Sequence, residues 1–169
     1  MENLNKNLLE KLAEAAHEIF YEDLILKGHK YGQFTKEYKK ENNLLKPYTK
    51  LSEKEKESSR NNVRDIPNKL TSIGYEIAKT QDNFTPAKFT SYEIEKLAKM
   101  EHGRWMQEKL GNGWQYAIKT DRSAKLHKSL ISWEKLSEDE KDKDRVLIKG
   151  IPKILSKAGY TMIKQRRKN

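Results

Sequence analysis

The sequence predicts a mainly helical protein made of two tandem copies of one helix–loop–helix unit, with short β segments at most. The first observation is self-similarity: a shift of 85 residues aligns the chain with itself without a gap, and 20 of 66 positions in 12–77 match 97–162. The second is that apolar residues recur at steps of three and four, as in amphipathic helices. The third is a set of capping boxes, each a serine or threonine followed three residues later by glutamate, at expected helix starts.

The first helix of each unit is defined by its apolar face and by a glycine stop. In the first unit the apolar positions end near Gly28, and glycine readily adopts the left-handed conformation that closes a helix. In the second unit the capping box from Thr90 to Glu93 starts the helix, and Gly111 or Gly113 ends it. The apolar positions are Leu8, Leu12, Ala15, Ala16, Ile19 and Leu26, then Ile94, Leu97, Ala98 and Trp105.

The second helix of each unit opens with a capping box at Ser52 or Ser137, where a side-chain oxygen accepts from a free backbone N–H. Pro67 and Pro152 are expected either to kink these helices or to start new ones. Gly74 and Gly159 end them, and short extended segments are expected at Tyr75–Ile77 and Tyr160–Met162.

The predicted organisation is a first repeat over 1–80, a linker over 81–90, a second repeat over 91–163 and a basic tail over 164–169. Each repeat contains an aromatic, polar loop of about twenty residues, and long loops in small domains usually carry function. One repeat has only a thin core, so we expect the two to pack together. Duplicated units often pack about a pseudo-twofold axis, which would place equivalent residues opposite each other across a seam.

Composition excludes several classes of protein. There is no cysteine, hence no disulfide and no thiolate zinc site. No apolar run of 18 residues is present, and Met1–Asn7 lacks the apolar stretch of a signal peptide, so the expectation is a cytoplasmic protein without a membrane partner. The net charge of +10 divides into +1 for residues 1–85 and +9 for residues 86–169. This field either attracts a phosphate-bearing partner or is a solvated lysine-rich surface.

Sequence motifs give no support for an enzyme. The segment His17–Tyr21 lacks the second histidine of a zinc protease, and Gly111-x-Gly113 lacks the third glycine of a dinucleotide fingerprint. No phosphate-binding Gly-Lys-Ser/Thr motif and no nucleophile-elbow serine occurs, and the four histidines lack paired spacing. We therefore expect no catalytic residues, no cofactor and no metal.

The second copy carries a specific combination of residues. It reads Glu101-His-x-Arg-Trp105, Gly113-Trp-x-Tyr116, Asp121, Lys125-x-His127, Trp133, Glu140-Lys-Asp-Lys-Asp-Arg145, Ile151-Pro152 and Gly159-Tyr160. The first copy has a weaker form, with Leu12-Ala13, His17-Glu18, Phe20, Gly28, Tyr31-Gly32, Pro47-Tyr48, Glu55-Lys56, Arg60 and Gly74-Tyr75. In order and spacing, the chain resembles tandem ryanodine receptor (RyR) repeat domains, especially the bacterial RyR-domain proteins.

The resemblance implies a helical tandem-repeat domain and suggests where a ligand would bind. In the giant calcium channels such domains are peripheral, and adenine-type nucleotides can bind between the two repeats; bacterial versions resemble sensor modules. The first copy departs from the pattern in having Phe20 where tryptophan is usual, His29 where the second copy has Trp114, and Ser59 before Arg60 in place of an Asp-Arg pair.

Phe20 and Trp105 occupy the same repeat position, so a pseudo-twofold arrangement would let them clamp a flat base across the seam. The alternative is that both rings belong to the core of their repeats. Arg104, Lys125 and Arg145 are the candidates for phosphate contacts, and the alternative is that they form surface charges or ion pairs.

His102 and Tyr116 complete the set of polar ligand-binding candidates. His17 and His102 recur at one helical position, where a structural hydrogen bond is the alternative to a functional role. The favoured function is a non-catalytic module that binds a nucleotide-like small molecule between the repeats. Two alternatives remain: a protein–protein interaction or scaffold repeat, and a basic protein that binds nucleic acid.

Overall fold

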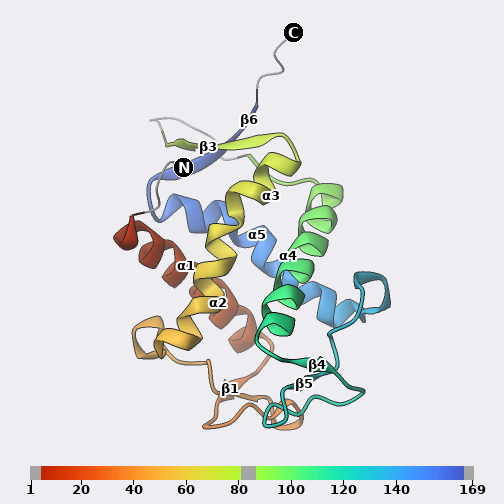
Figure 1. Ribbon diagram of the computed structural model, residues 1–169. Helices are drawn as coiled ribbons and strands as arrows, with labels where there is room; N and C mark the ends of the chain where they lie inside the picture. The colour runs from red at the N-terminus through yellow and green to blue at the C-terminus, as the bar shows by residue number, and fades with distance from the viewer. Residues whose placement is uncertain (1–4, 81–86, 166–169) are drawn as a thin grey trace. The chain divides into compact units, whose positions relative to one another are not determined.

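The computed structural model describes residues 5–80 and 87–165 and is mainly helical (Figure 1). The predicted linker falls partly on residues 81–86 and the basic tail mostly on residues 166–169, both outside the described residues. In chain order the helices are α1 (Lys6–Leu26), α2 (Glu53–Arg64), α3 (Ile66–Ser72), α4 (Ser91–Gly111) and α5 (Glu138–Ser156). The strands are β1 (Lys30–Tyr31), β2 (Glu41–Asn42), β3 (Tyr75–Lys79), β4 (Gln115–Tyr116), β5 (Leu126–His127) and β6 (Tyr160–Lys164).

The first helix of each repeat ends as the sequence predicts. Gly28 follows the cap of α1 and Gly113 follows the cap of α4, each with φ of +78°, in the left-handed region that glycine adopts without strain. At the other end of α4, Thr90 and Glu93 form both halves of the predicted capping box. The periodicity and the end signals therefore specified these two helices.

The second helices differ between the repeats. Ser52 and Glu55 form a complete capping box at α2, which ends at Arg64, and α3 then starts with Pro67 in its first turn. In the second repeat, α5 continues through Pro152 as one helix. Of the two outcomes expected for the prolines, the start of a new helix is therefore found at Pro67, whereas Pro152 lies inside one helix. At the third predicted box, the Glu140 N–H donates to the Ser137 hydroxyl at 3.4 Å, and the Glu140 carboxylate accepts from the Ser129 hydroxyl at 2.9 Å.

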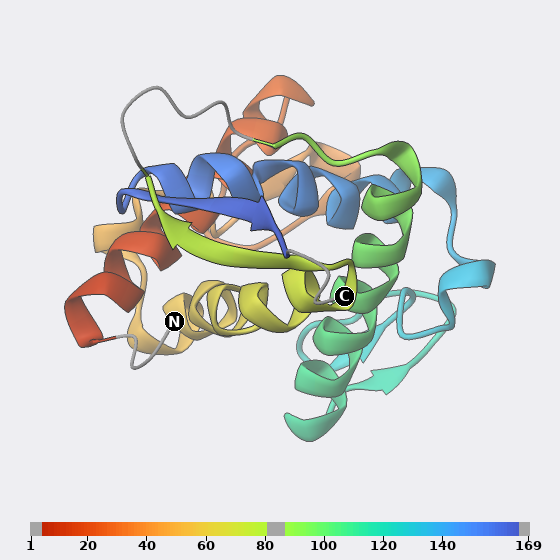
Figure 2. The same ribbon diagram turned by 90° about the horizontal axis from the view of Figure 1, so that it is seen from above.

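The predicted extended segments at the ends of the repeats form an antiparallel pair, β3 with β6 (Figure 2). Its register is symmetric between the copies: Ile77 pairs with Met162, its own counterpart, while Tyr75 pairs with Lys164 and Lys79 with Tyr160. Within the loops, β1 pairs with β2 and β4 with β5, each in parallel over two residues. The pseudo-twofold relation of whole repeats stays a prediction.

Packing divides the chain into two compact units that do not follow the sequence repeat. Unit 1 comprises residues 1–88 and 149–169, and unit 2 comprises residues 89–148. In unit 1, α1 and α2 lie side by side (Figure 1). Its buried apolar side chains include Leu12, Ala13, Val63, Ile66, Leu70, Tyr75, Ile154, Leu155 and Met162. Unit 2 buries Leu97, Ala98, Leu130, Leu136 and Ile148.

The net charge is divided differently between the two units than between the two halves of the sequence. Unit 1 contains 23 basic and 14 acidic residues, a net charge of +9, and unit 2 contains 12 and 11, a net charge of +1. The excess arises because residues 149–169 include seven basic residues and no acidic one. No helix within the described residues is long and apolar enough to cross a membrane.

Candidate functional site

Equivalent histidines tie the first helix of each repeat to its loop. His17 Nε2 lies 2.8 Å from the Lys46 carbonyl oxygen, and His102 Nε2 lies 2.8 Å from that of Ile131, the counterpart of Lys46. Because a carbonyl oxygen only accepts hydrogen bonds, Nε2 is the protonated nitrogen in both rings. The geometry thus fits a structural hydrogen bond from Nε2 at both histidines. The surroundings of the other ring nitrogen, Nδ1, differ between the repeats.

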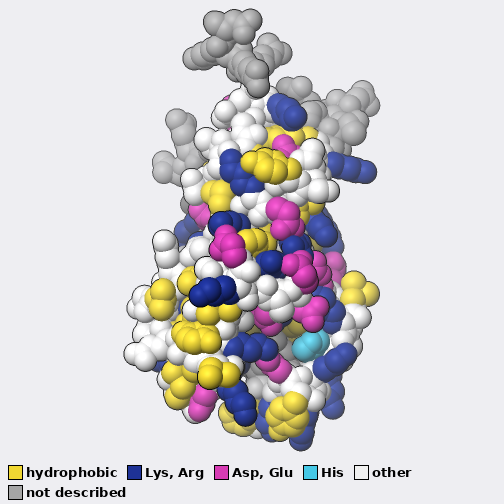
Figure 3. All heavy atoms as spheres, turned by 90° about the vertical axis from the view of Figure 1, so that its right-hand side faces the viewer, with side chains coloured by type: hydrophobic (Ala, Val, Ile, Leu, Met, Phe, Trp, Pro, Cys, Tyr) yellow, Lys and Arg dark blue, Asp and Glu magenta, His cyan; other side chains and the backbone are white. Residues whose placement is uncertain are grey.

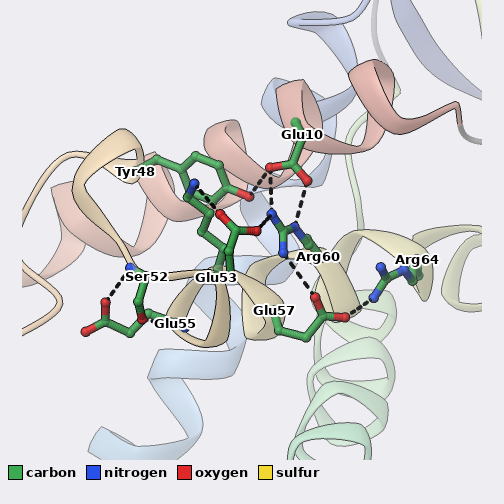
Figure 4. Close-up of polar contacts among 9 residues, drawn as sticks. Glu10, Tyr48, Ser52, Glu53, Glu55, Glu57, Arg60 and Arg64 are labelled. Carbon is green, nitrogen blue, oxygen red and sulfur yellow. Dashed lines mark hydrogen bonds and ion pairs between the residues drawn. The ribbon is translucent and has the colours of Figure 1, made fainter.

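Equivalent arginines tie the second helix back to the first. Figure 4 shows the Arg60 guanidinium donating to both Glu10 oxygens, at 2.7 and 3.0 Å, and also to Glu53 and Glu57. Arg145 repeats this with the counterparts Glu95 and Glu138. Hydrogen bonds that Arg145 donates to Glu95 raise the pKa of Arg145 despite some desolvation, so this predicted phosphate contact already has two carboxylate partners.

Lys125 occupies a helix-capping position. Its amine donates to the backbone oxygen of Asn112, the cap of α4, at 3.0 Å, and Lys40 donates to Lys27 of α1 in the same way at 2.9 Å. A cation at this end of a helix is favoured because the terminal carbonyls carry partial negative charge. Both lysines have left-handed backbones, with φ of 54° and 51°, so the sequence repeat reproduces even an uncommon conformation.

Arg104 is held by carboxylates on its own helix. It forms a bidentate pair with Glu101, whose side chain is 1% exposed, and donates to Glu108 at 2.6 Å. Burial lowers the pKa of Arg104, but the Glu101 and Glu108 carboxylates outweigh it and the net direction is upward. All three predicted phosphate contacts therefore have protein partners in the structure, and their role toward a ligand stays a prediction.

The predicted stacking residues are half-buried and belong to different units. Trp105 in unit 2 stacks on His102, with ring centroids 5.7 Å apart, and meets His127 edge-on at 4.9 Å. Phe20 in unit 1 lies 5.9 Å from His17. Each ring thus contacts the histidine of its own repeat, and a clamp between the two stays a prediction. Tyr116 lies in β4 and is 54% exposed.

The two histidines differ in their second ring nitrogen. His102 Nδ1 lies 3.5 Å from an Asp144 oxygen, whereas the first repeat has Ser59 at that position. Burial lowers the pKa of His102, but Asp144 reverses the shift to above the ordinary value; burial also raises the pKa of Asp144. For His17, burial lowers the pKa and outweighs the hydrogen bond to Lys46, so the pKa values of the two histidines are shifted in opposite directions.

Unit 1 also contains a hollow that the sequence interpretation did not anticipate. It has a volume of about 310 Å³ and is lined by Glu14, His17, Glu18, Tyr21, Pro47 and Tyr48; we call it the His17 hollow. Positions 14, 17, 18 and 21 lie on one face of α1, since they are three and four residues apart. That spacing is visible in the sequence, but the acids beside His17 do not recur in the second copy, which has Lys99 and Gly103 there, so the repeat pattern does not indicate them.

Within residues 5–80 and 87–165, no group of three histidine, aspartate or glutamate side chains is arranged to hold a metal ion.

The RyR domain family model matches the chain twice, over residues 1–79 and 85–164. These matches follow the sequence duplication, with its paired histidine, arginine and capping-lysine positions. The chain therefore belongs to the RyR domain family and carries two of its domains in tandem.

Proposed function

We propose that this chain is a non-catalytic ligand-binding module and that the His17 hollow is its binding site. The observation that carries the proposal is a hollow of about 310 Å³ lined by a histidine, whose pKa is lowered by burial, and by two tyrosines. Binding sites for small molecules are concave, largely apolar and furnished with a few polar groups, and their volumes start near 300 Å³.

The surroundings of the hollow favour binding over catalysis. His17 donates its Nε2 proton to a backbone oxygen, and the Tyr48 hydroxyl donates to Glu10 at 3.0 Å. Burial together with Glu10 raises the pKa of Tyr48 to about 12, so the phenol keeps its proton near neutral pH. The His17 and Tyr48 side chains are thus committed to hydrogen bonds within the fold, which supports a site that binds without reacting.

The sequence-predicted nucleotide site and the His17 hollow make different demands on the structure. A phosphate bound at Arg104, Lys125 or Arg145 would compete with the carboxylate and carbonyl groups that already hold these side chains. The hollow requires at most the exchange of one exposed ion pair, between Lys157 and Glu18. We therefore place the ligand in the hollow and keep the nucleotide clamp of Phe20 and Trp105 as the alternative to be tested beside it.

A thermal-shift screen with a panel of nucleotides, nucleosides, amines and amino acids tests the proposal. A ligand at 100 times its Kd stabilises the folded state by about 2.7 kcal/mol, or several degrees for a chain of this size. Tyr21→Ala should abolish the shift, whereas Tyr38→Ala, at an 81% exposed tyrosine outside the hollow, should retain it. A shift lost in Trp105→Ala but kept in Tyr21→Ala would instead place the ligand at the sequence-predicted site.

A second candidate function is binding of a protein partner. Both repeats expose apolar side chains at the end of the first helix and in the following loop. In unit 1 they include Leu26 at 86% and Phe34 at 65% exposure, and in unit 2 Leu110 at 52% and Ile118 at 84%. Such residues favour an interaction role when they gather in one patch. Leu26→Ser with Phe34→Ser should then abolish co-purification of a partner and leave the thermal shift intact.

The nucleic-acid alternative has weaker support. Lys153 and Lys157 in the basic stretch lie within 4 Å of Glu22 and Glu18, which neutralise part of the excess charge of unit 1. Basic and acidic side chains are interspersed over the face shown in Figure 3, without a continuous basic surface there. A mobility-shift assay at low salt tests this alternative, because phosphate contacts are strongest under those conditions.

A further inference from the structure

We propose that the His17 hollow selects an organic cation, an alkylammonium group held against the rings of His17, Tyr21 and Tyr48 and neutralised by Glu14 and Glu18. The proposal rests on the hollow being the binding site. It adds the chemical class of the ligand, which differs from the anionic nucleotide that the sequence suggests.

The arrangement of the rings suits a rounded group better than a flat one. The His17 ring lies 6.4 Å from that of Tyr21 at an interplanar angle of 55°, and 6.0 Å from that of Tyr48 at 52°. Rings inclined in this way form the walls of a corner, whereas a nucleobase stacks best on a face parallel to its own plane. Aromatic corners are the usual receptors for ammonium groups, which are attracted to the negative faces of the rings.

The charges at the hollow have the sign that this ligand requires. Two of the six lining residues are glutamates, and no lysine or arginine is among the six. The nearby amines of Lys46 and Lys56 pair with Glu55 and Glu53, at 3.0 and 2.9 Å, and the Lys56 amine also lies 5.4 Å from the centre of the Tyr48 ring. The lining itself therefore contains two carboxylates and no lysine or arginine, and burial lowers the pKa of His17, which favours a cationic ligand over a phosphate.

Lys157 shows that the rim accepts an ammonium group. Its Nζ lies 3.6 Å from a Glu18 oxygen, and both side chains are about half exposed. An exposed pair of this kind is weak and easily exchanged. A ligand amine can therefore take the place of Lys157 at Glu18 while its alkyl portion contacts the rings.

The second repeat provides an internal comparison. At the positions equivalent to the lining of the hollow it has Lys99, His102, Gly103, Met106, Ser132 and Trp133. The histidine and one aromatic position are kept, but both acids are gone and one of them has become a lysine, whose amine pairs with Glu134. The elements that build the repeat are thus shared, whereas the set of groups suited to a cation is confined to the first copy.

The test is an NMR titration of the full chain, following the His17 and Tyr21 side-chain signals at constant ionic strength. The probes are tetramethylammonium, spermidine, Nα-acetyl-lysine methylamide, adenosine and adenosine monophosphate, with sodium chloride as the blank. We expect saturable shifts with the cationic probes and none with the monophosphate. Glu14→Gln with Glu18→Gln should weaken binding at least tenfold, whereas Glu22→Gln, an exposed carboxylate on the same helix outside the hollow, should change it less than twofold.

The outcomes separate the two proposals. Saturation by adenosine or the monophosphate but not by the cations would keep the hollow as a binding site and overturn the cationic ligand. Shifts no larger than those of sodium chloride with every probe would overturn both. Binding of tetramethylammonium and spermidine indicates a free organic cation, and binding of the lysine amide alone indicates a lysine side chain of a partner; either result supports the inference. If the double variant folds poorly, Glu18→Gln alone replaces it in the titration, with a smaller expected loss of affinity.

Discussion

Gly150 is the position where the structure makes the sharpest prediction about stability. It lies in the part of α5 that belongs to unit 1, and a Cβ built on it would come within 2.9 Å of both Cγ atoms of Ile19 and 3.2 Å of its Cδ1. Optimal carbon–carbon contacts are about 3.5–4.0 Å, so Gly150→Ala forces α5 or Ile19 to move by roughly half an ångström or more. Overpacking of this kind costs about 1–3 kcal/mol.

Gly103 is the matched control because it also lies within a helix but has free space. No atom lies within 4 Å of a Cβ built there, outside its own helix. Gly103→Ala should therefore stabilise the protein by about 0.5–1 kcal/mol, the usual advantage of alanine over glycine in a helix. Gly150→Ala gains the same advantage, so its net effect is a loss of about 1 kcal/mol.

The assay is urea unfolding at 25 °C followed by far-ultraviolet circular dichroism. Tryptophan fluorescence adds the response of unit 2, since all three tryptophans, at positions 105, 114 and 133, lie within it. The two variants should differ by about 2 kcal/mol, which is about 4–8 °C in Tm at 2–4 °C per kcal/mol. Adding Ile19→Ala to Gly150→Ala should show a favourable coupling of about 1 kcal/mol or more, because the overlapping atoms are removed. Equal stabilisation by both glycine substitutions would refute the close approach of α5 to α1.

Three further predictions concern the paired positions of the repeats. The histidines should titrate on opposite sides of the ordinary pKa, His17 below and His102 above it, and Asp144→Asn should lower the pKa of His102 alone, as followed by the imidazole NMR signals. The folded pKa of both His102 and Asp144 is raised, so their contribution to stability is present at low pH. This contribution is lost as the pH rises from about 4 through the pKa of His102. Urea midpoints of the wild type and of Asp144→Asn at pH 5 and pH 8 should reveal the loss. Lys125→Met should cost about 0.5–1.5 kcal/mol through loss of its bond to the Asn112 carbonyl, and unchanged urea stability would show that the cap is unimportant. Glu10→Gln should lower the pKa of Tyr48 from about 12 toward 10, read from phenolate absorbance, and a pKa that stays near 12 would assign the shift to burial alone.

The sequence predicts the local structure well where the signal is itself local. The ends of α1 and α4 are marked by Gly28 and Gly113, whose φ values are positive, and two of the three capping boxes form as expected. These features depend on a few neighbouring residues, so spacing is enough to find them. The duplication could be found in the same way, because both copies keep one register without a gap.

Long-range pairing could not be predicted from the same patterns. The extended segments at the two repeat ends were expected, but their pairing as β3 and β6 joins residues far apart in the chain and places the end of the second repeat in unit 1. The burial of Lys69, at 0% exposure beside Asp65, and of Glu101 beside Arg104 is likewise invisible to spacing. A charged side chain is buried only when tertiary packing brings its partner, and periodicity contains no information on that.

The candidate site could be predicted only in part for a related reason. Arg145 and Lys125 are predicted phosphate contacts because their side chains are cationic, but both positions recur in the first repeat, where Arg60 and Lys40 make the same contacts within the protein. Recurrence alone therefore cannot separate a ligand contact from a helix cap or an ion pair. The structure separates them by showing the partner of each side chain.

The duplication then becomes a means of locating function within one molecule. Positions that keep both residue type and contact in the two copies, such as His17 with His102 and Arg60 with Arg145, are needed to build the repeat. Positions that keep the backbone and change the chemistry are free to serve a ligand. Around the shared histidine, Glu14 and Glu18 of the first copy become Lys99 and Gly103 in the second. Transferring the acids together with the missing ring should therefore transfer the binding: Lys99→Glu, Gly103→Glu and Met106→Tyr should give the second repeat a measurable affinity for tetramethylammonium, seen as a shift of the His102 signal that the wild-type chain does not show.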